Sequence, residues 1–267
     1  MDVKDRVIII TGGASGIGAA LGRLFVEEGA AHVALADLDR PGAEAVAHEI
    51  GDRASAHGLD VTDAAAVKAL VDTVEANHGP VGLYVSNAGI LVADTPDFTI
   101  FSASDADWRK SWDVNVHAHL HACRAVLPGM LARGEGGFLI TASAAGLLSQ
   151  IGASAYSATK HAAVGFAESL AITHGDDGIY VAALCPQAVE SKMSAGAEDS
   201  SAALDGVMPG PEMARRTLDQ MREGRFMIRP HEQVEQYFQA KAADYDRWVG
   251  AMRKLRRKQM ERTGRPI

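Results

Sequence analysis

Tyr156 and Lys160 have side chains that could carry out proton transfer, and they stand four positions apart. On a helix, this spacing places both residues on one face. A nearby ammonium stabilises a phenolate and lowers the pKa of a tyrosine from its usual value of about 10. The pair could therefore act as an acid and base in catalysis. The same spacing is common on ordinary helices, so this interpretation needs support from other residues.

Ser143 gives the first support. It lies 13 residues before Tyr156, just after an apolar segment at 138–141 that is typical of a buried strand. Ligands of doubly wound α/β folds bind outside the carboxyl ends of the strands. We therefore expect the Ser143 hydroxyl to lie at the same edge of the sheet as the tyrosine and the lysine.

A glycine-rich turn occupies residues 11–18, between an apolar segment at 7–10 and a helical pattern that ends at Gly29. Gly12, Gly16 and Gly18 lack side chains, so the backbone can turn sharply and approach a pyrophosphate at the start of the helix. A glycine triplet alone is weak evidence. A strand before it and a helix after it are, however, the context of a dinucleotide site.

Asp37 follows a second strand pattern at 33–36 and lies 19 residues beyond Gly18. An acid at this place accepts hydrogen bonds from the ribose hydroxyls of NAD, and its charge would repel the 2′-phosphate of NADP. The sequence therefore predicts NAD as the cofactor. Aspartate also follows many strands simply as a turn residue, and Arg40 is close enough in sequence to complicate the prediction.

Strand and helix patterns alternate along the rest of the chain. Strand patterns lie near residues 55–58, 83–86, 138–141, 180–184 and 226–228, with helical stretches between them. This alternation predicts an α/β fold of the Rossmann type, a doubly wound parallel sheet of about seven strands with helices on both faces. We expect residues 1–267 to form a single domain.

Several element boundaries can be predicted. Thr62 and Asp63 could cap a helix that runs to about residue 78, and Ser104 and Asp105 could cap one that runs to about residue 133. Pro128 should bend or end the second helix early. Periodicity disappears at 190–210, which we interpret as part of a substrate lid over 190–223. Residues 231–267 form a C-terminal helical extension.

Composition limits the possible classes of protein. The chain has 267 residues, 47% of them hydrophobic and 22% charged, as in a folded globular protein. A net charge of −8 argues against nonspecific nucleic-acid binding. Two cysteines, Cys123 and Cys185, cannot form a disulfide framework. No apolar run approaches the ~20 residues of a membrane span and no secretory signal pattern is present, so we expect a cytoplasmic protein.

The C-terminal extension is basic. Residues 241–267 carry a net charge of +6, against −14 for residues 1–240. Trp248, Met252 and Leu255 would form an apolar stripe on a helix in this region. The helix could contact an anionic membrane, but packing on the same or a neighbouring subunit is the favoured interpretation.

A zinc site can be considered for a group of histidines and a cysteine on one predicted helix. His117 and His121 would share one face of this helix, and His119 and Cys123 another. No carboxylate is patterned with them. We therefore predict that the protein has no metal site.

The glycine turn, Ser143, Tyr156 and Lys160 together resemble the short-chain dehydrogenase/reductase family, and the resemblance extends from residue 6 to about residue 231. It implies that the chain binds a nicotinamide dinucleotide. The residues that it implies for cofactor binding are Gly12, Ser15, Gly16, Ile17, Gly18, Asp37, Leu38, Asp60, Val61, Asn87, Ala88, Gly89, Tyr156, Lys160, Pro186, Val189 and Ser191.

The same resemblance assigns catalytic roles. Tyr156 is implied to be the acid and base, Ser143 to orient and polarise the substrate oxygen, and Asn115 to help hold a water in a proton relay. Lys160 is implied to bind the nicotinamide ribose and to lower the pKa of the tyrosine. The residues expected to contact substrate are Ser143, Ala145, Ile151, Tyr156 and Gln187.

Two positions depart from the family's usual pattern. Ser86 stands where the family usually has asparagine, a change that should affect sheet hydrogen bonding more than chemistry. Gln187 stands where the family usually has glycine after the proline, and its amide either contacts the substrate or points to solvent. The remaining pocket candidates are mostly apolar and favour a small hydrophobic alcohol or ketone: Leu91, Val92, Leu147, Leu148 and Gln150.

These expectations combine into an NAD-dependent oxidoreductase that interconverts a secondary alcohol and a ketone. The resemblance also implies a homodimer or homotetramer. Two alternatives stay open. One is an NADPH-dependent reductase of ketones or 3-oxoacyl thioesters, and the other is a catalytically silent dinucleotide-binding sensor or scaffold.

Overall fold

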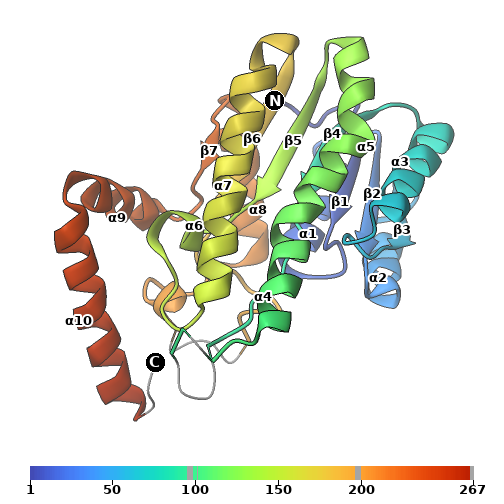
Figure 1. Ribbon diagram of the computed structural model, residues 1–267. Coiled ribbons are helices and arrows are strands. Elements are labelled where there is room, and N and C mark those ends of the chain that lie inside the picture. The colour runs from blue at the N-terminus through green and yellow to red at the C-terminus, as the bar shows by residue number, and fades with distance from the viewer. Residues whose placement is uncertain (95–98, 101, 196–199, 265–267) are drawn as a thin grey trace.

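Seven parallel strands form one sheet at the centre of the computed structural model (Figure 1). The structure describes residues 1–94, 99–100, 102–195 and 200–264. The strand order is β3-β2-β1-β4-β5-β6-β7, so the direction of winding reverses between β1 and β4. The strands are β1 (Val7–Thr11), β2 (His32–Asp37), β3 (Ala54–Gly58), β4 (Val81–Ser86), β5 (Gly136–Thr141), β6 (Ile179–Leu184) and β7 (Met227–Ile228).

Helices cover both faces of this sheet, which confirms the predicted Rossmann-type architecture (Figure 1). α3, α5 and α7 pack on one face and α1, α2 and α8 on the other. The helices are α1 (Gly16–Glu27), α2 (Arg40–Ile50), α3 (Ala64–His78), α4 (Asp105–Trp112), α5 (Ala118–Arg133), α6 (Ala145–Leu148), α7 (Ser154–His174), α8 (Gly210–Arg222), α9 (Glu232–Ala243) and α10 (Tyr245–Thr263).

The apolar runs of the sequence form the buried strands, as predicted. Every residue of β1 and β5 is buried, because both strands are covered on two faces. The predicted cap of α3 is also correct, since the Asp63 carboxylate accepts hydrogen bonds from the backbone of Ala65 and Ala66. Ser104 caps α4 through a reciprocal capping box with Asp107.

The helix predicted from Ser104 differs from the expectation in two ways. A π-helical segment at Asp113–His117 separates α4 from α5. Pro128 lies inside α5 but does not end it, because the helix continues to Arg133. Val126 and Met130, on either side of the proline, are buried against the sheet, and this packing holds the helix together despite the missing backbone donor.

The described part of residues 190–210 is irregular, as expected, although residues 196–199 lie outside the described residues. Its two ends are joined, because Met208 donates to the Ala188 carbonyl and Glu190 donates to the Met208 carbonyl. Residues 201–203 form a single 3-10 turn. The second half of the predicted lid region is the regular helix α8.

The C-terminal extension is helical, as predicted, and consists of the two helices α9 and α10. The helical conformation is interrupted at Asp244, between the two helices. Its carboxylate caps α10 by accepting a hydrogen bond from the Arg247 backbone. In Figure 1, α10 lies beyond the β7 edge of the sheet. Trp248 is partly buried against the core, as an apolar stripe facing the body requires. Among the described helices, none is long and apolar enough to cross a membrane.

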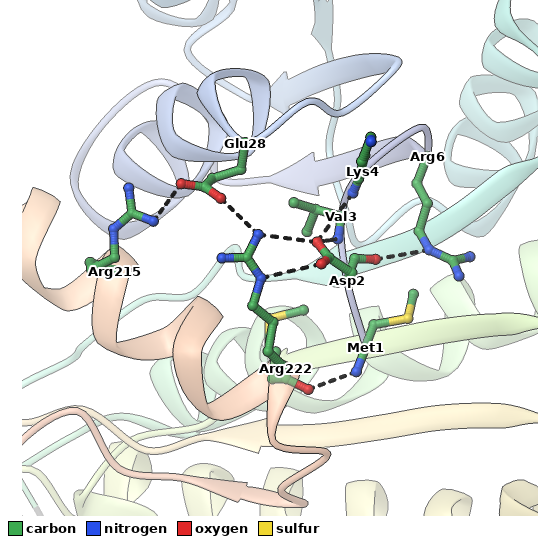
Figure 2. A network of polar contacts seen from close by, with 9 residues as sticks. Met1, Asp2, Val3, Lys4, Arg6, Glu28, Arg215 and Arg222 are labelled. Carbon is green, nitrogen blue, oxygen red and sulfur yellow. Dashed lines mark hydrogen bonds and ion pairs between the residues drawn. The ribbon is translucent and has the colours of Figure 1, made fainter.

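Figure 2 shows how the first residues of the chain are attached to the body. The Arg222 guanidinium of α8 pairs with Asp2 at 3.3 Å and with Glu28, at the end of α1, at 2.7 Å. Arg215, two turns earlier on the same face of α8, also pairs with Glu28. The network joins the N-terminal segment to α1 and α8 on one face of the sheet.

Candidate active site

A cleft of about 1390 Å³ opens at the carboxyl ends of the strands, around the point where the strand order reverses. Ligands of doubly wound folds bind at this point. Every residue that the sequence suggested for cofactor binding lines the cleft except Gly18, which is buried behind the turn. The fold therefore brings together the residues predicted for cofactor binding, which come from the glycine turn, the ends of β2 and β4, α7 and the segment after β6.

The glycine turn needs glycine at each predicted position. Gly12 and Gly16 have φ angles of +71° and +51°, in the left-handed region that favours glycine. A Cβ atom at Gly18 would lie 2.1 Å from the Gly12 carbonyl oxygen. Ser15, at the N-cap of α1, makes no side-chain capping hydrogen bond. The first backbone N–H groups of α1 therefore suit a phosphate group.

Asn87 fixes the turn from the neighbouring strand. Its side-chain amide donates to the carbonyl oxygens of Thr11 at 2.9 Å and Gly12 at 3.3 Å. The backbone N–H groups of Asn87 and Ala88 both donate to the Thr11 hydroxyl. These contacts join the segment after β4 to the start of the glycine turn.

Asp37 points back toward the glycine turn. Its carboxylate accepts hydrogen bonds from the backbone N–H of Ala14 at 3.0 Å and of Asp39 at 2.9 Å. Each oxygen still has a lone pair that could accept from a ribose hydroxyl. Arg40, which complicated the sequence prediction, forms an ion pair with Glu44 at 2.8 Å. The group nearest the glycine turn at the end of β2 is therefore an anion.

Lys192 is a cleft residue that the sequence did not reveal. Its ammonium pairs at 2.9 Å with Asp39, the N-cap residue of α2. Next to it, Ser191 lies against Gly16, where a Cβ atom would approach the Ser191 Cβ to 2.8 Å. The start of the lid therefore lies over the glycine turn. No local pattern connects residues 153 positions apart, so only the fold reveals this contact.

Tyr156, Ser143 and Lys160 come together as predicted. Tyr156 and Lys160 share the buried face of α7, and the Ser143 side chain lies near enough to influence the pKa of Tyr156. The Lys160 ammonium lies 5.7 Å from the centre of the tyrosine ring and donates to the Thr141 carbonyl at 2.9 Å. α6 crosses α7 closely here, since a Cβ atom at Gly146 would lie 2.4 Å from the Lys160 carbonyl oxygen.

The pKa shifts of this group differ from the expectation. Burial raises the pKa of Tyr156 above its usual value, while the nearby Ser143 side chain lowers it in part. Burial also lowers the pKa of Lys160 to about 8. The predicted lowering of the tyrosine pKa by the lysine is therefore wrong for the protein by itself, because desolvation of the phenolate is the largest effect.

Asn115 lies in the π-helical segment between α4 and α5. π-Helical turns of this kind often occur at functional sites. Its amide accepts from the Ile90 backbone at 2.9 Å and donates to the Ile90 carbonyl and the Thr159 hydroxyl. A Cβ atom at Gly89 would lie 3.2 Å from the Asn115 oxygen and 3.3 Å from the Lys160 nitrogen. Asn115 thus joins the segment after β4 to the catalytic helix.

A further carboxylate holds the start of α7. Asp94 is 5% exposed, and it accepts hydrogen bonds from the backbone N–H of Ser154 at 2.9 Å and from the Ser154 hydroxyl at 2.7 Å. Its own N–H donates to the Gly152 carbonyl. The N-cap residue Ala153 has no side chain that could cap the helix. Asp94 therefore caps α7 from a distant part of the chain. The residue that it holds, Ser154, lies two positions before Tyr156.

The substrate side of the cleft agrees only in part with the prediction. Leu91, Gln150 and Ile151 line the cleft. Ala145, Leu147 and Leu148 are buried and are not among the described residues that line it. They belong to the short helix α6. Ala145 packs against Ala153 and Tyr156, which do line the cleft. Sequence proximity to Ser143 was therefore a poor guide to contact with the cleft.

Gln187 lines the cleft, but its amide is not free to point into solvent. Its side-chain nitrogen donates to the Asp205 carboxylate at 3.1 Å, and Asp205 accepts a second hydrogen bond from the Tyr237 hydroxyl. The Gln187 side-chain oxygen is buried without a hydrogen-bond partner among the described residues. The lid and α9 therefore determine the orientation of this side chain.

The histidines of the α5 region have separate partners. His117 pairs with Asp113, so a carboxylate does accompany one of them, contrary to the sequence analysis. His119 is buried against the Ser86 hydroxyl at 2.7 Å, and His121 contacts the Val61 carbonyl. The contact of Ser86 with His119 explains the departure at position 86, because serine leaves room for a buried histidine. Within the described residues, no group of three or more metal-ligating side chains comes together.

This fold and this site together define a dinucleotide-binding oxidoreductase of the Rossmann type. The model of the family described as short chain dehydrogenase matches residues 6–202. The chain belongs to this family.

Two relatives and one solved structure show how broad the similarity is. The chain is 34% identical over 203 residues to 3beta-hydroxysteroid dehydrogenase 2 of Eggerthella lenta, covering 74% of this chain and 76% of the relative. It is 28% identical over 212 residues to a 3-oxoacyl-acyl-carrier-protein reductase of Vibrio harveyi, covering 79% and 85%. A short-chain dehydrogenase/reductase of Burkholderia phymatum, solved in complex with NAD, superposes with a TM-score of 0.82 at 25% identity, covering 92% of this chain and 96% of that one.

Proposed function

We propose that the protein is an NAD-dependent dehydrogenase that interconverts a secondary alcohol and a ketone. The observation that supports this most directly is the placement of Tyr156, Ser143 and Lys160 in one cleft with the glycine turn and Asp37. A sensor or scaffold would need the cofactor cleft. It would not need a buried lysine that lies beside a tyrosine and has a carbonyl group as its described partner. The intact catalytic group therefore favours an enzyme over the silent alternative.

The residues of the cleft fit a nicotinamide dinucleotide. The N–H groups after Gly12 would hold its pyrophosphate and Asp37 its adenosine ribose. Asp60, Val61 and the segment after β6 would hold the two ring systems. When bound, the nicotinamide ring supplies the hydride or accepts it.

In this proposal the protein's own residues orient the substrate and move one proton. The Ser143 hydroxyl holds the reacting oxygen. The Tyr156 hydroxyl gives a proton to that oxygen in reduction, and its phenolate takes one in oxidation. Because burial raises the pKa of Tyr156, the phenolate needs a positive charge beside it, and the Lys160 ammonium is the nearest described cation to its ring.

The cofactor preference is part of the proposal. Asp37 favours NAD because its charge would repel a 2′-phosphate, and the solved relative with NAD is consistent with this. The alternative, an NADPH-dependent reductase of 3-oxoacyl thioesters, is supported by the similarity to the Vibrio harveyi reductase. We favour the dehydrogenase because two described cations near the end of β2 are both paired with carboxylates, Arg40 with Glu44 and Lys192 with Asp39.

The substrate we propose is a small hydrophobic alcohol or ketone. Leu91, Ala93 and Ile151 give the described substrate side an apolar surface, and a relative is named as a hydroxysteroid dehydrogenase. We also infer a homodimer or homotetramer, as the family resemblance implies.

One experiment tests the function. A panel of secondary alcohols, including cyclic and steroid alcohols, would be incubated with the protein and NAD or NADP, and NADH or NADPH formation followed by absorbance. Turnover with NAD that exceeds turnover with NADP is the expected result. Faster turnover of 3-oxoacyl thioesters with NADPH would favour the reductase, and binding of NADH without turnover of any substrate would favour the silent protein.

A further inference from the structure

His231 is a buried histidine that the proposed chemistry does not use. It lies at the N-cap of α9, three residues after β7, and only 4% of it is exposed. Both of its ring nitrogens contact the turn at residues 186–188, which lines the cleft directly after β6. We propose that His231 is a positioning residue of the active site, whose neutral imidazole holds this turn in the wall of the cleft.

The two hydrogen bonds require one particular form of the imidazole. The backbone N–H of Gln187 donates to Nδ1 at 3.2 Å, so Nδ1 must be an acceptor. The carbonyl of Ala188 lies 3.2 Å from Nε2 and can only accept, so Nε2 must carry the proton. The neutral Nε2–H tautomer alone satisfies both contacts. A protonated ring would direct an N–H group at the N–H of Gln187.

The turn held by His231 has contacts on its other side with parts of the active site. The Pro186 carbonyl accepts from the Ala144 backbone at 2.8 Å and from the Ser143 hydroxyl at 3.5 Å. The Ala188 carbonyl also accepts from Met208 at the end of the lid. Displacing the turn would therefore move an acceptor of the catalytic serine and an anchor of the lid together.

A second contact from the same extension acts on the same turn. The Tyr237 hydroxyl of α9 donates to Asp205, and Asp205 in turn accepts from the Gln187 side chain. The turn is thus held at its backbone by His231 and at a side chain through Asp205. This explains why the C-terminal extension, remote in sequence from the cofactor motifs, contacts the site.

The surroundings of His231 favour its neutral form. Burial lowers its pKa below the usual value for histidine, and Arg216 of α8 acts in the same direction. The hydrogen bond to the Ala188 carbonyl raises this pKa, as do Asp205 of the lid and Glu212 of α8, but burial has the larger effect. The charged group next to it on α9 is Glu232, which is 85% exposed. At neutral pH the imidazole is therefore uncharged and suited to its two contacts.

The inference rests on the proposed function only in that the turn borders the cofactor, so its test uses cofactor binding and not turnover. His231→Gln places a carbonyl and an amide about where the two ring nitrogens lie and should keep both contacts. His231→Leu keeps the bulk and loses both. His48→Gln, at an exposed histidine of α2, is the matched control.

NADH affinity, measured by fluorescence at pH 7.5, should fall about tenfold in His231→Leu, the effect of losing roughly 1.4 kcal/mol. It should stay within about twofold of the wild type in His231→Gln and His48→Gln. In protein labelled with 15N-histidine, the signal that is missing from His231→Gln should show a protonated Nε2 and an unprotonated Nδ1. As the pH is lowered toward 5, the wild type should lose affinity relative to His231→Gln.

Three results would overturn the inference: wild-type affinity in His231→Leu, the opposite tautomer, or an unchanged affinity ratio between wild type and His231→Gln at low pH. If the wild type binds neither NADH nor NADPH, the proposed function fails. The tautomer and the melting temperature of His231→Leu then decide the positioning role alone. The two failures are therefore distinguishable.

Discussion

The Lys160 ammonium lies 5.7 Å from the centre of the Tyr156 ring, and its described hydrogen-bond partner is a carbonyl, that of Thr141. Lys160 is 3% exposed. A buried cation without a carboxylate partner is costly to the folded state, and buried groups with strongly shifted pKa values are concentrated at functional sites. The burial of this lysine is therefore unfavourable for stability and is consistent with the catalytic role proposed for it.

Lys160→Met should make the protein more stable and less active. At pH 7 the free energy of unfolding should rise by roughly 1–3 kcal/mol, because a buried charge is removed. The burial penalty on the wild type applies below its folded pKa of about 8 and disappears as the pH rises toward the ordinary 10.5. The difference between variant and wild type should therefore shrink over that range. Thermal unfolding at pH 7 and pH 10 measures it, with the exposed Lys254→Met as control, and a less stable variant at pH 7 would contradict the argument.

Tyr156→Phe should reduce kcat by about 100- to 10,000-fold, the usual contribution of a general acid and base. NADH affinity should change little, because the phenyl ring keeps its packing. Steady-state kinetics and fluorescence titration measure the two quantities, and Tyr245→Phe on the exposed side of α10 serves as control. Turnover near that of the wild type would show that another group transfers the proton.

Asp37→Ala should relax the choice of cofactor. Removing the carboxylate takes away both the acceptor for the ribose hydroxyls and the charge that repels a 2′-phosphate. The ratio of NADH to NADPH affinity should fall by at least about tenfold, or roughly 1.4 kcal/mol. Paired fluorescence titrations measure the ratio. A wild type that already prefers NADPH would contradict the proposed cofactor.

Asp94→Ala should loosen the start of α7. The change leaves the Ser154 backbone N–H without its acceptor, and losing a helix cap costs about 1–2 kcal/mol. The variant should melt earlier and lose catalytic efficiency, because Tyr156 lies in the same helical turn. Ser154→Ala removes only the hydroxyl contact and should have a smaller effect in both measurements. Equal losses in the two variants would mean that the backbone contact contributes nothing.

Lys192→Met should speed the release of NADH. The ion pair joins Lys192, which lines the cleft, to Asp39 at the start of α2, and we expect it to open when a dinucleotide leaves. Both side chains are exposed, so the effect should be small, about two- to fivefold at low salt. It should vanish at high ionic strength, where exposed charges are screened. Stopped-flow displacement of NADH measures it, Asp39→Asn should behave alike, and an effect that persists in high salt would rule out the ion pair.

The sequence predicted the parts of this molecule that depend on local patterns. Apolar runs located the strands, and Asp63 marked the start of α3. The glycine spacing and Asp37 located the cofactor cleft, because the carboxyl ends of parallel strands must meet at one edge.

Contacts between distant segments could not be predicted. Asp94 caps a helix 60 residues away, and Lys192 reaches Asp39 over 153 positions. His231 contacts Gln187 only because β7 lies beside β6. The pKa of Tyr156 was misjudged for the same reason, since desolvation depends on the whole fold and not on the spacing of two residues.

The walls of the cleft come from almost the full length of the chain, from Gly12 to Gln259 and Arg262 of α10. A growing polypeptide presents its N-terminal part first. The glycine turn and its strands thus exist well before the helix that completes the opposite side. During synthesis, the part of the cleft around the glycine turn would therefore form first, and the wall contributed by α10 would form last. A chain that stopped before α10 would have the first part and lack the second.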